Sequence, residues 1–156
     1  MQLADVLDID RIAVDVAVSS KKSLLEKAAE LLASDPEGGD AREIFESLCQ
    51  RERLGSTGLG HGVAIPHGRV SGQSAVTAAL IRLRHPIDFD APDQEKVDVF
   101  VALAVPDQCS DVYLRLLADL AERLGDADQR LRLRSAERGE DLLNLFTLET
   151  GPAAGP

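Results

Sequence analysis

The sequence predicts an α/β fold, a single layered domain in which a mixed β-sheet carries helices on both faces. The 156 residues match the size of one compact domain. Apolar segments with strand character are interleaved with amphipathic segments that have helical spacing. The segment "VDVFVALAV" at 97–105 is almost continuously apolar, as expected of a central strand covered on both faces. We expect the domain to span 1–150 and to be followed by a short disordered tail at 151–156.

The first third of the chain predicts one strand and two helices. Loose alternation in "IAVDVAV", residues 12–18, indicates a short strand. Leucine and alanine recur at helical spacing over 19–36, where a proline stops the run. Asp40, with Glu43 three residues later, has the pattern of an acidic capping box. It predicts a second helix that begins there and ends near Leu54.

The rest of the chain predicts two long strands and three helices. The strands are expected at 75–84 and 97–105, joined by a polar connection with two prolines. Ser110 is expected to cap a helix with one apolar stripe. The stripe consists of Tyr113, Leu117, Leu120 and Leu124, and two further short helices are expected at 126–136 and 139–149.

The net charge excludes one class of partner. With a formal charge of -10 and a pI near 4.7, the chain would repel a phosphate backbone, so we predict no nucleic-acid partner. The acidity favours solubility, and a negative surface that suits a basic partner is the alternative interpretation.

Apolar runs and cysteine usage indicate the compartment. No run reaches the ~18 consecutive apolar residues of a membrane span, and the N-terminus lacks the pattern of a signal peptide. We therefore expect no membrane insertion and a cytoplasmic location. Cys49 and Cys109 form no Cys-x-x-Cys or metal pattern, so each is expected to be a small, half-buried apolar residue in a reducing compartment.

The stretch "RERLGSTGLGHGVAIPHGRV", residues 51–70, is unlike the rest of the chain and holds five glycines, two histidines and three arginines. Ser56 and Thr57 follow the second helix and offer hydroxyl and N–H groups in a segment that can wrap an anion. The stretch is no Walker loop, because no Gly-Lys-Ser or Gly-Lys-Thr follows. We expect it to be mainly loop, and a turn-rich connection without a site is the alternative.

Arg51 is a candidate for holding an anion. It follows Ile44 at i+7 and Leu48 at i+3, which places it on the core stripe of the predicted helix. A cation on that stripe needs a partner. The alternative is an arginine of the last turn that bonds the helix carbonyls and reaches water.

His67 is a candidate nucleophile. Pro66 restricts the backbone on both sides of itself, so the imidazole follows a stiff, apolar lead-in, and Gly68 is expected to leave room beside the ring. A neutral ring nitrogen can attack a phosphoryl donor while the other nitrogen's hydrogen bond fixes the tautomer. A structural histidine with satisfied hydrogen bonds is the alternative.

The other two histidines do not complete a metal site. His61 and His85 flank His67 along the chain, but no His-x-x-x-His or cysteine cluster accompanies them. We therefore predict no metal and no other cofactor. His61, between two glycines, is expected at the rim of the site, and His85 on the surface.

The segment "RERLGSTGLGHGVAIPHG" resembles the phosphorylation-site signature of phosphotransferase-system enzyme IIA domains of the fructose/mannitol superfamily, in particular the nitrogen-regulatory branch. The resemblance extends from about Val6 to Glu149 and includes "HPIDFDAPDQEKVDVFVALAVP". It implies the layered fold of the mannitol enzyme IIA.

The resemblance also implies a phosphotransferase activity through a phosphohistidine. His67 would accept a phosphoryl group from the phosphohistidine of an HPr-type carrier protein. Arg51 matches the family's active-site arginine, and Ser56 and Thr57 match the hydroxyl residues beside the phosphate. Such donors suit the charge of a loose phosphoryl-transfer transition state. The phosphorylated and free forms would then regulate different protein targets, such as kinases or transporters.

Tyr113 departs from the family pattern. Members usually carry a second histidine at this place, at the start of the helix after "VALAVP". A tyrosine hydroxyl can donate one hydrogen bond to a phosphate oxygen but brings no positive charge at neutral pH. Tyr113 as a plain core residue is the alternative.

Three other functions stay open on the sequence alone. One is a sugar-transport enzyme IIA that passes the phosphoryl group to a IIB partner. Another is a non-catalytic module that binds an anion or a protein through the same loop. The third is a metal hydrolase that uses His61 and His67. The sequence also leaves open the oligomeric state, the downstream target and the reacting ring nitrogen.

Overall fold

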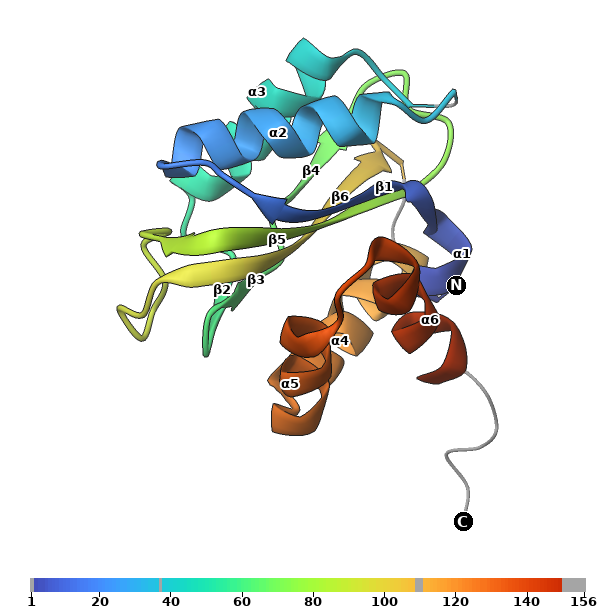
Figure 1. Cartoon of the computed structure of the whole chain (residues 1–156). Coiled ribbons are helices and arrows are strands. Elements are labelled where there is room, and N and C mark those ends of the chain that lie inside the picture. Colours follow the sequence, from blue (N-terminus) through green and yellow to red (C-terminus); the bar gives the residue numbers. More distant parts are fainter. Residues whose placement is uncertain (1, 37, 109–110, 150–156) are drawn as a thin grey trace.

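The fold is a three-layer α/β arrangement, seen in a computed structural model that describes residues 2–36, 38–108 and 111–149. Helices α2 (Lys21–Ala33) and α3 (Ala41–Arg53) cover one face of the sheet, and α4 (Asp111–Gly125), α5 (Ala127–Ser135) and α6 (Gly139–Glu149) cover the other (Figure 1). The predicted fold class is therefore confirmed. Cys109, the predicted cap at Ser110 and the predicted tail lie outside the described residues.

The sheet is mixed, and β6 is the strand on which the others are organised. The order is β1-β5-β6-β3-β2, and β4 also pairs with β6. β5 runs antiparallel to β6, whereas β3 and β4 run parallel to it and β1 runs parallel to β5. The strands are β1 (Leu7–Val16), β2 (Gly58–Gly60), β3 (Val63–Ala64), β4 (His67–Val70), β5 (Thr77–Ile87) and β6 (Val97–Pro106).

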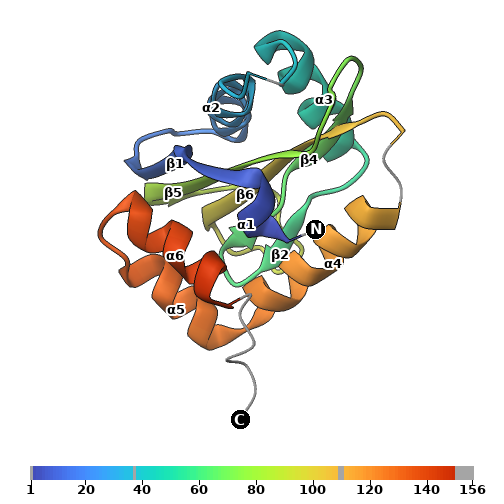
Figure 2. The same cartoon turned by 90° about the vertical axis from the view of Figure 1, so that its right-hand side faces the viewer.

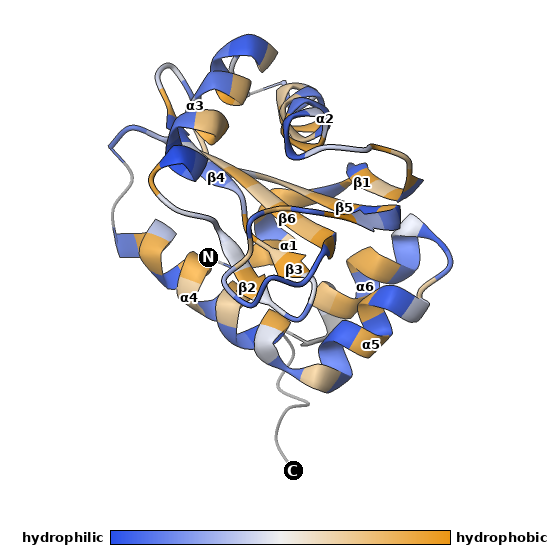
Figure 3. Cartoon of the chain, turned by 90° about the vertical axis from the view of Figure 1, so that its left-hand side faces the viewer, coloured by the Kyte–Doolittle hydropathy of each residue, from blue (hydrophilic) through white to orange (hydrophobic). Residues whose placement is uncertain are grey.

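The side chains of β6 alternate between two cores. Phe100 and Ala102 pack in the core beneath α2 and α3, while Val101 and Leu103 pack in the core beneath α4 and α6. Figure 3 shows β5 and β6 as hydrophobic strands between helices of mixed hydropathy. The predicted central strand, buried on both faces, is therefore confirmed.

The predicted helix boundaries follow from capping. The Asp40 carboxylate accepts hydrogen bonds from the backbone N–H groups of Arg42 and Glu43, which confirms the predicted start of α3. The helix ends at Arg53, with Leu54 as its C-cap. In α4 the buried residues are Tyr113, Leu116, Leu120 and Leu124, and Leu117 packs against them.

The structure adds one helix that was not predicted and contradicts one local prediction. The short helix α1 (Leu3–Val6) was not predicted, because four residues are too few to show a helical period. The glycine-rich stretch, expected to be mainly loop, contains β2, β3 and β4. β3 and β4 pair with β6, a strand about 35 residues away, and β2 pairs with β3; sequence patterns report local periodicity and not such distant pairing.

Figure 2 shows the same layers from the side, with α1 close to α6. Within the described residues, no helix is both long and apolar enough to cross a membrane.

Candidate functional site

The backbone of residues 63–70 places His67 at the start of an edge strand. β3 pairs with β6 at Val99 and Phe100, and β4 resumes the parallel pairing with His67 opposite Leu103. Between them, the Ile65 N–H donates to the Thr57 carbonyl at 3.0 Å, which ties this lead-in to the loop after α3. The interruption at 65–66 leaves the Ile65 carbonyl free to bond a side chain.

The His67 ring has a defined tautomer. Its Nδ1 lies 2.7 Å from the Ile65 carbonyl oxygen. A carbonyl oxygen can only accept, so Nδ1 carries the proton and donates it. The lone pair is consequently on Nε2, which is the ring nitrogen able to act as a nucleophile. The ring is half-buried, which keeps one edge accessible.

The surroundings of the ring favour its neutral form. Burial lowers the pKa of His67 below its ordinary value of 6.5 and is the largest influence. The hydrogen bond to Ile65 opposes this shift by raising the pKa. The Arg51 charge lowers the pKa and the Glu52 charge raises it. The net direction is downward, so the ring is uncharged at neutral pH.

We predict a pH dependence from this shift. An NMR titration of the His67 ring should have its midpoint below 6.5. Because the folded-state pKa is lower than the unfolded one, the unfolded chain binds more protons between the two values, so stability falls as the pH drops through this window. The variant His67→Asn should lack that part of the slope. A midpoint at or above 6.5 would contradict the neutral ring.

Arg51 lies in the last turn of α3, close enough to lower the pKa of His67 by its charge. Its Nη1–H donates to the Gly55 carbonyl at 2.8 Å, just beyond the helix end. That bond uses one of the five N–H groups of a guanidinium. The structure therefore brings Arg51 to His67 and also gives it the helix-end contact considered from the sequence.

Ser56 and Thr57 hold the loop in this structure. The Ser56 hydroxyl donates to the Phe89 carbonyl at 3.0 Å and accepts from the Gly58 N–H at 3.0 Å. The buried Thr57 hydroxyl donates to the Glu52 carboxylate. Neither hydroxyl is directed at His67 by these bonds.

Tyr113 contacts the His67 ring, and Arg69 contacts Tyr113. The Tyr113 ring meets the His67 ring edge-on, with centroids 6.0 Å apart and an interplanar angle of 61°. The Arg69 guanidinium carbon lies 5.3 Å from the centroid of the Tyr113 ring. Sequence reasoning placed Tyr113 here and missed Arg69. The available signal was its spacing of two from His67, because alternate residues of a strand share a face.

His61 lies elsewhere. It forms, with Gly62, the two-residue turn between β2 and β3, and both have positive φ, 58° and 81°. This is the pattern of a type I′ hairpin turn. Gly62 is bonded to Asp98 and Val99 of β6, whereas His67 pairs with Leu103, about 13 Å further along the strand. The structure does not bring His61 to His67.

The third histidine, His85, lies away from the site. His85 is exposed in β5, as predicted. In the described ranges, no group of three or more His, Cys, Asp or Glu side chains is arranged to hold a metal ion.

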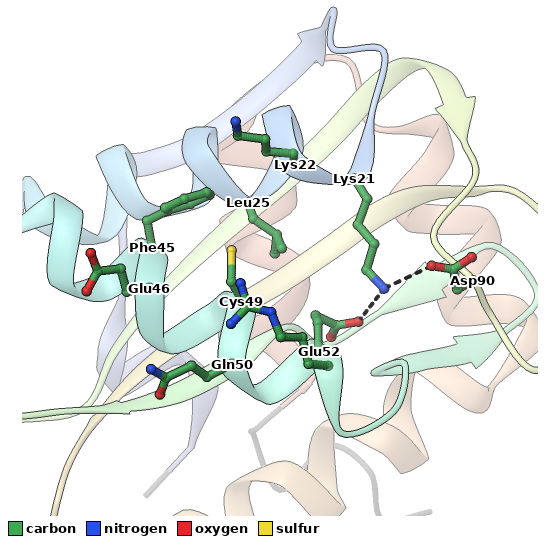
Figure 4. A pocket seen from close by; sticks show the side chains of 10 residues that line it. Lys21, Lys22, Leu25, Phe45, Glu46, Cys49, Gln50, Glu52 and Asp90 are labelled. Atoms are coloured by element: carbon green, nitrogen blue, oxygen red, sulfur yellow. Dashed lines mark hydrogen bonds and ion pairs between the residues drawn. The ribbon is translucent and has the colours of Figure 1, made fainter.

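Sequence reasoning missed a buried acidic residue next to the site. Glu52 is 7% exposed and forms an ion pair with Lys21, with Oε1 and Nζ 3.0 Å apart. The pair lies in a groove of about 770 Å³ between α2 and α3, which Cys49 also lines (Figure 4). The signal was present: Glu52 follows Leu48 at i+4, and so it occupies the core stripe more fully than Arg51.

Comparisons with known proteins agree with this fold. A "Nitrogen regulatory protein" from Pseudomonas aeruginosa is 43% identical over 145 residues, which cover 93% of this chain and 94% of that protein. The crystal structure of Nitrogen Regulatory Protein IIA-Ntr from Neisseria meningitidis has a TM-score of 0.87 and 38% identity, covering 92% of this chain and 97% of that one. IIA mannitol from Escherichia coli shares the fold, with a TM-score of 0.75, 17% identity and coverage of 89% and 97%.

The family described as "Phosphoenolpyruvate-dependent sugar phosphotransferase system, EIIA 2" matches residues 5–148. This match covers nearly the whole described chain, including the site around His67 and both sheet faces. The resemblance inferred from the glycine-rich stretch is confirmed: the chain belongs to the EIIA type 2 family of the phosphotransferase system.

Proposed function

We propose that this chain is a phosphoryl-accepting regulatory EIIA protein of the cytoplasm, phosphorylated on His67 by the phosphohistidine of an HPr-type carrier protein. The observation that carries the proposal is the hydrogen bond from Nδ1–H of His67 to the Ile65 carbonyl. It leaves Nε2 with a lone pair on a half-buried, neutral ring.

The proposed step exchanges one N–P bond for another. The Nε2 lone pair of His67 attacks the phosphorus of the carrier's phosphohistidine, and the bonding pair of the broken N–P bond returns to the carrier's ring nitrogen. The His67 ring keeps its proton on Nδ1 and gains positive charge as the Nε2–P bond forms. The Ile65 carbonyl stabilises that charge through the hydrogen bond already present. The fixed tautomer therefore assists both attack and product formation.

Arg51 is proposed to stabilise the phosphoryl oxygens in the transition state. Its charge reaches the His67 ring, and it has N–H groups beyond the one bonded to Gly55. Ser56 and Thr57 are proposed to line the phosphate side of the loop, and in the free protein their hydroxyls hold the loop by donating to Phe89 and Glu52. Tyr113, in edge contact with the ring, is proposed to donate its hydroxyl to a phosphate oxygen.

Regulation is proposed to follow from the added charge. A phosphoryl group on His67 brings about two negative charges to a half-buried surface position. A target that binds the free protein there would meet repulsion or a new charge-assisted contact after phosphorylation. The "Nitrogen regulatory protein" name of the Pseudomonas aeruginosa relative supports regulation, with kinases or transporters as the proposed targets.

The test uses the purified chain, an HPr-type carrier and the enzyme that phosphorylates that carrier. We expect a mass gain of one phosphoryl group that is stable in base and lost in acid, and we expect none in His67→Asn. A folded wild-type chain that gains no mass, under conditions that modify a related EIIA protein, would leave a non-catalytic binding module as the better account.

A further inference from the structure

A chain of polar contacts connects the groove between α2 and α3 with the ring of His67. It begins at Lys21, whose Nζ lies 3.0 Å from Glu52 and 3.3 Å from Asp90 (Figure 4). The same ammonium lies 4.7 Å from the centroid of the Phe89 ring. The Lys21 ammonium is thus held by Glu52 of α3 and by Phe89 and Asp90 of the segment after β5.

The Glu52 carboxylate then fixes Thr57. The Thr57 N–H lies 3.2 and 3.3 Å from the two carboxylate oxygens, and the Thr57 hydroxyl donates to the same carboxylate. Both residues are buried, at 7% exposure each. A carboxylate in such a position is stable only while its ion pair and hydrogen bonds are intact. The loop after α3 is therefore fastened to the helix at Thr57.

Thr57 in turn fixes the residue that orients the ring. Its carbonyl accepts the Ile65 N–H at 3.0 Å, and the Ile65 carbonyl accepts Nδ1–H of His67 at 2.7 Å. Gly58 and Ala64, next to these residues, are paired across β2 and β3. Ile65, whose carbonyl selects the tautomer of His67, is thus held through its N–H by Thr57, and Thr57 is anchored by Glu52.

We propose that Glu52 is a positioning residue: through Thr57 and Ile65 it keeps His67 in the tautomer with its proton on Nδ1 and its lone pair on Nε2. The inference rests on the proposed function for its effect on phosphoryl transfer, but the tautomer itself is a property of the unphosphorylated protein. Lys21 is the counter-ion that makes the buried carboxylate stable.

The effect on the reaction follows from the precision that transfer requires. If Thr57 loses its anchor, the Ile65 carbonyl is no longer held in one place, and the ring can rotate or exchange its proton between the two nitrogens. A misplacement of about 1 Å in a reacting group can cost about 100-fold in rate. Glu52 does not need to touch the phosphoryl group to have this effect.

The experiment compares Glu52→Met with Glu52→Gln in the full chain. Methionine keeps most of the buried volume and removes the acceptor, whereas glutamine keeps an oxygen that can accept from Thr57. Glu46→Gln is the matched control, because Glu46 lines the same groove but is exposed and paired with Arg42. The readouts are the ring ¹⁵N shifts of His67 without any carrier and the rate of phosphorylation by the carrier.

We expect Glu52→Met to show a mixture of His67 tautomers and a rate lower by about 10- to 100-fold. Glu52→Gln should keep the single tautomer and lose only a few-fold in rate, with its His67 titration midpoint below that of the wild type because a carboxylate that raises the pKa is gone. Glu46→Gln should match the wild type in both readouts.

The inference is overturned if folded Glu52→Met retains the single Nδ1–H tautomer, whether or not its rate falls. If Glu52→Met does not fold because Lys21 loses its partner, the double variant Lys21→Met/Glu52→Met, which leaves no uncompensated charge, takes its place, and a single Nδ1–H tautomer in it overturns the inference. These results are separable from the proposed function. A wild type that accepts no phosphoryl group refutes the function, while the tautomer comparison still decides the role of Glu52.

Discussion

Arg51→Ala is expected to slow phosphoryl transfer to His67 by about 100- to 1,000-fold, the usual cost of removing one preorganised donor from a developing anion. The guanidinium is close enough to lower the pKa of His67 by its charge. At a half-buried position the effective dielectric constant is lower than in water, so a fixed cation there stabilises a nearby negative charge more than it would in bulk solvent. The measurement is the single-turnover rate with a phosphorylated carrier in excess.

The control for this prediction is Arg53→Ala. Arg53 lies two residues further along α3, is exposed and faces the groove between the helices. We expect it to leave the rate unchanged. Both variants should keep the folded state, because the hydrogen bond from Arg51 to the Gly55 carbonyl is worth about 1 kcal/mol. If Arg51→Ala loses stability and rate in proportion, Arg51 acts mainly at the helix end.

Gly68→Ala is expected to destabilise the fold by about 1 to 3 kcal/mol, as overpacking usually does. A Cβ at this position would lie 3.0 Å from the backbone carbonyl atoms of Ser47 in α3 and closer still to its hydroxyl. The hydroxyl could rotate, but it donates to the Arg69 carbonyl at 2.6 Å. The strand that begins with His67 would therefore have to move away from the helix.

Gly125→Ala is the matched control, since a Cβ there meets no atom within 4 Å. We expect it to be neutral or to stabilise by up to about 1 kcal/mol, because Gly125 is the last residue of α4. The free energy of unfolding from urea titration decides the comparison. Equal values for the two variants would show that β4 and α3 can separate at no cost.

The sequence predicted those parts of the fold that have local causes. The Asp40 cap and the continuous apolar run of β6 could each be recognised within one segment, and both were confirmed. The short strands β3 and β4 could not, because they form by pairing with β6, which is distant in sequence, and β2 in turn pairs with β3. For the same reason Gly68 was expected to make room for the His67 ring, whereas it makes room for α3.

Only part of the candidate site could be predicted. The family resemblance placed Arg51 and Tyr113 beside His67; in the structure the Tyr113 ring contacts the His67 ring, and the Arg51 charge is close enough to lower the pKa of His67. His61 was placed there because it is near in sequence, but a hairpin turn carries it to the other end of β6. Glu52 was overlooked because a glutamate on a helix is usually solvated, and its partner Lys21 comes from a different helix.

The most direct test of the account is to phosphorylate the ¹⁵N-histidine-labelled chain with the carrier and to record its ring nitrogens by NMR. The account predicts phosphorus on Nε2 of His67, with Nδ1 still protonated and bonded to the Ile65 carbonyl. Phosphorus on Nδ1, or on His61 or His85, would contradict it.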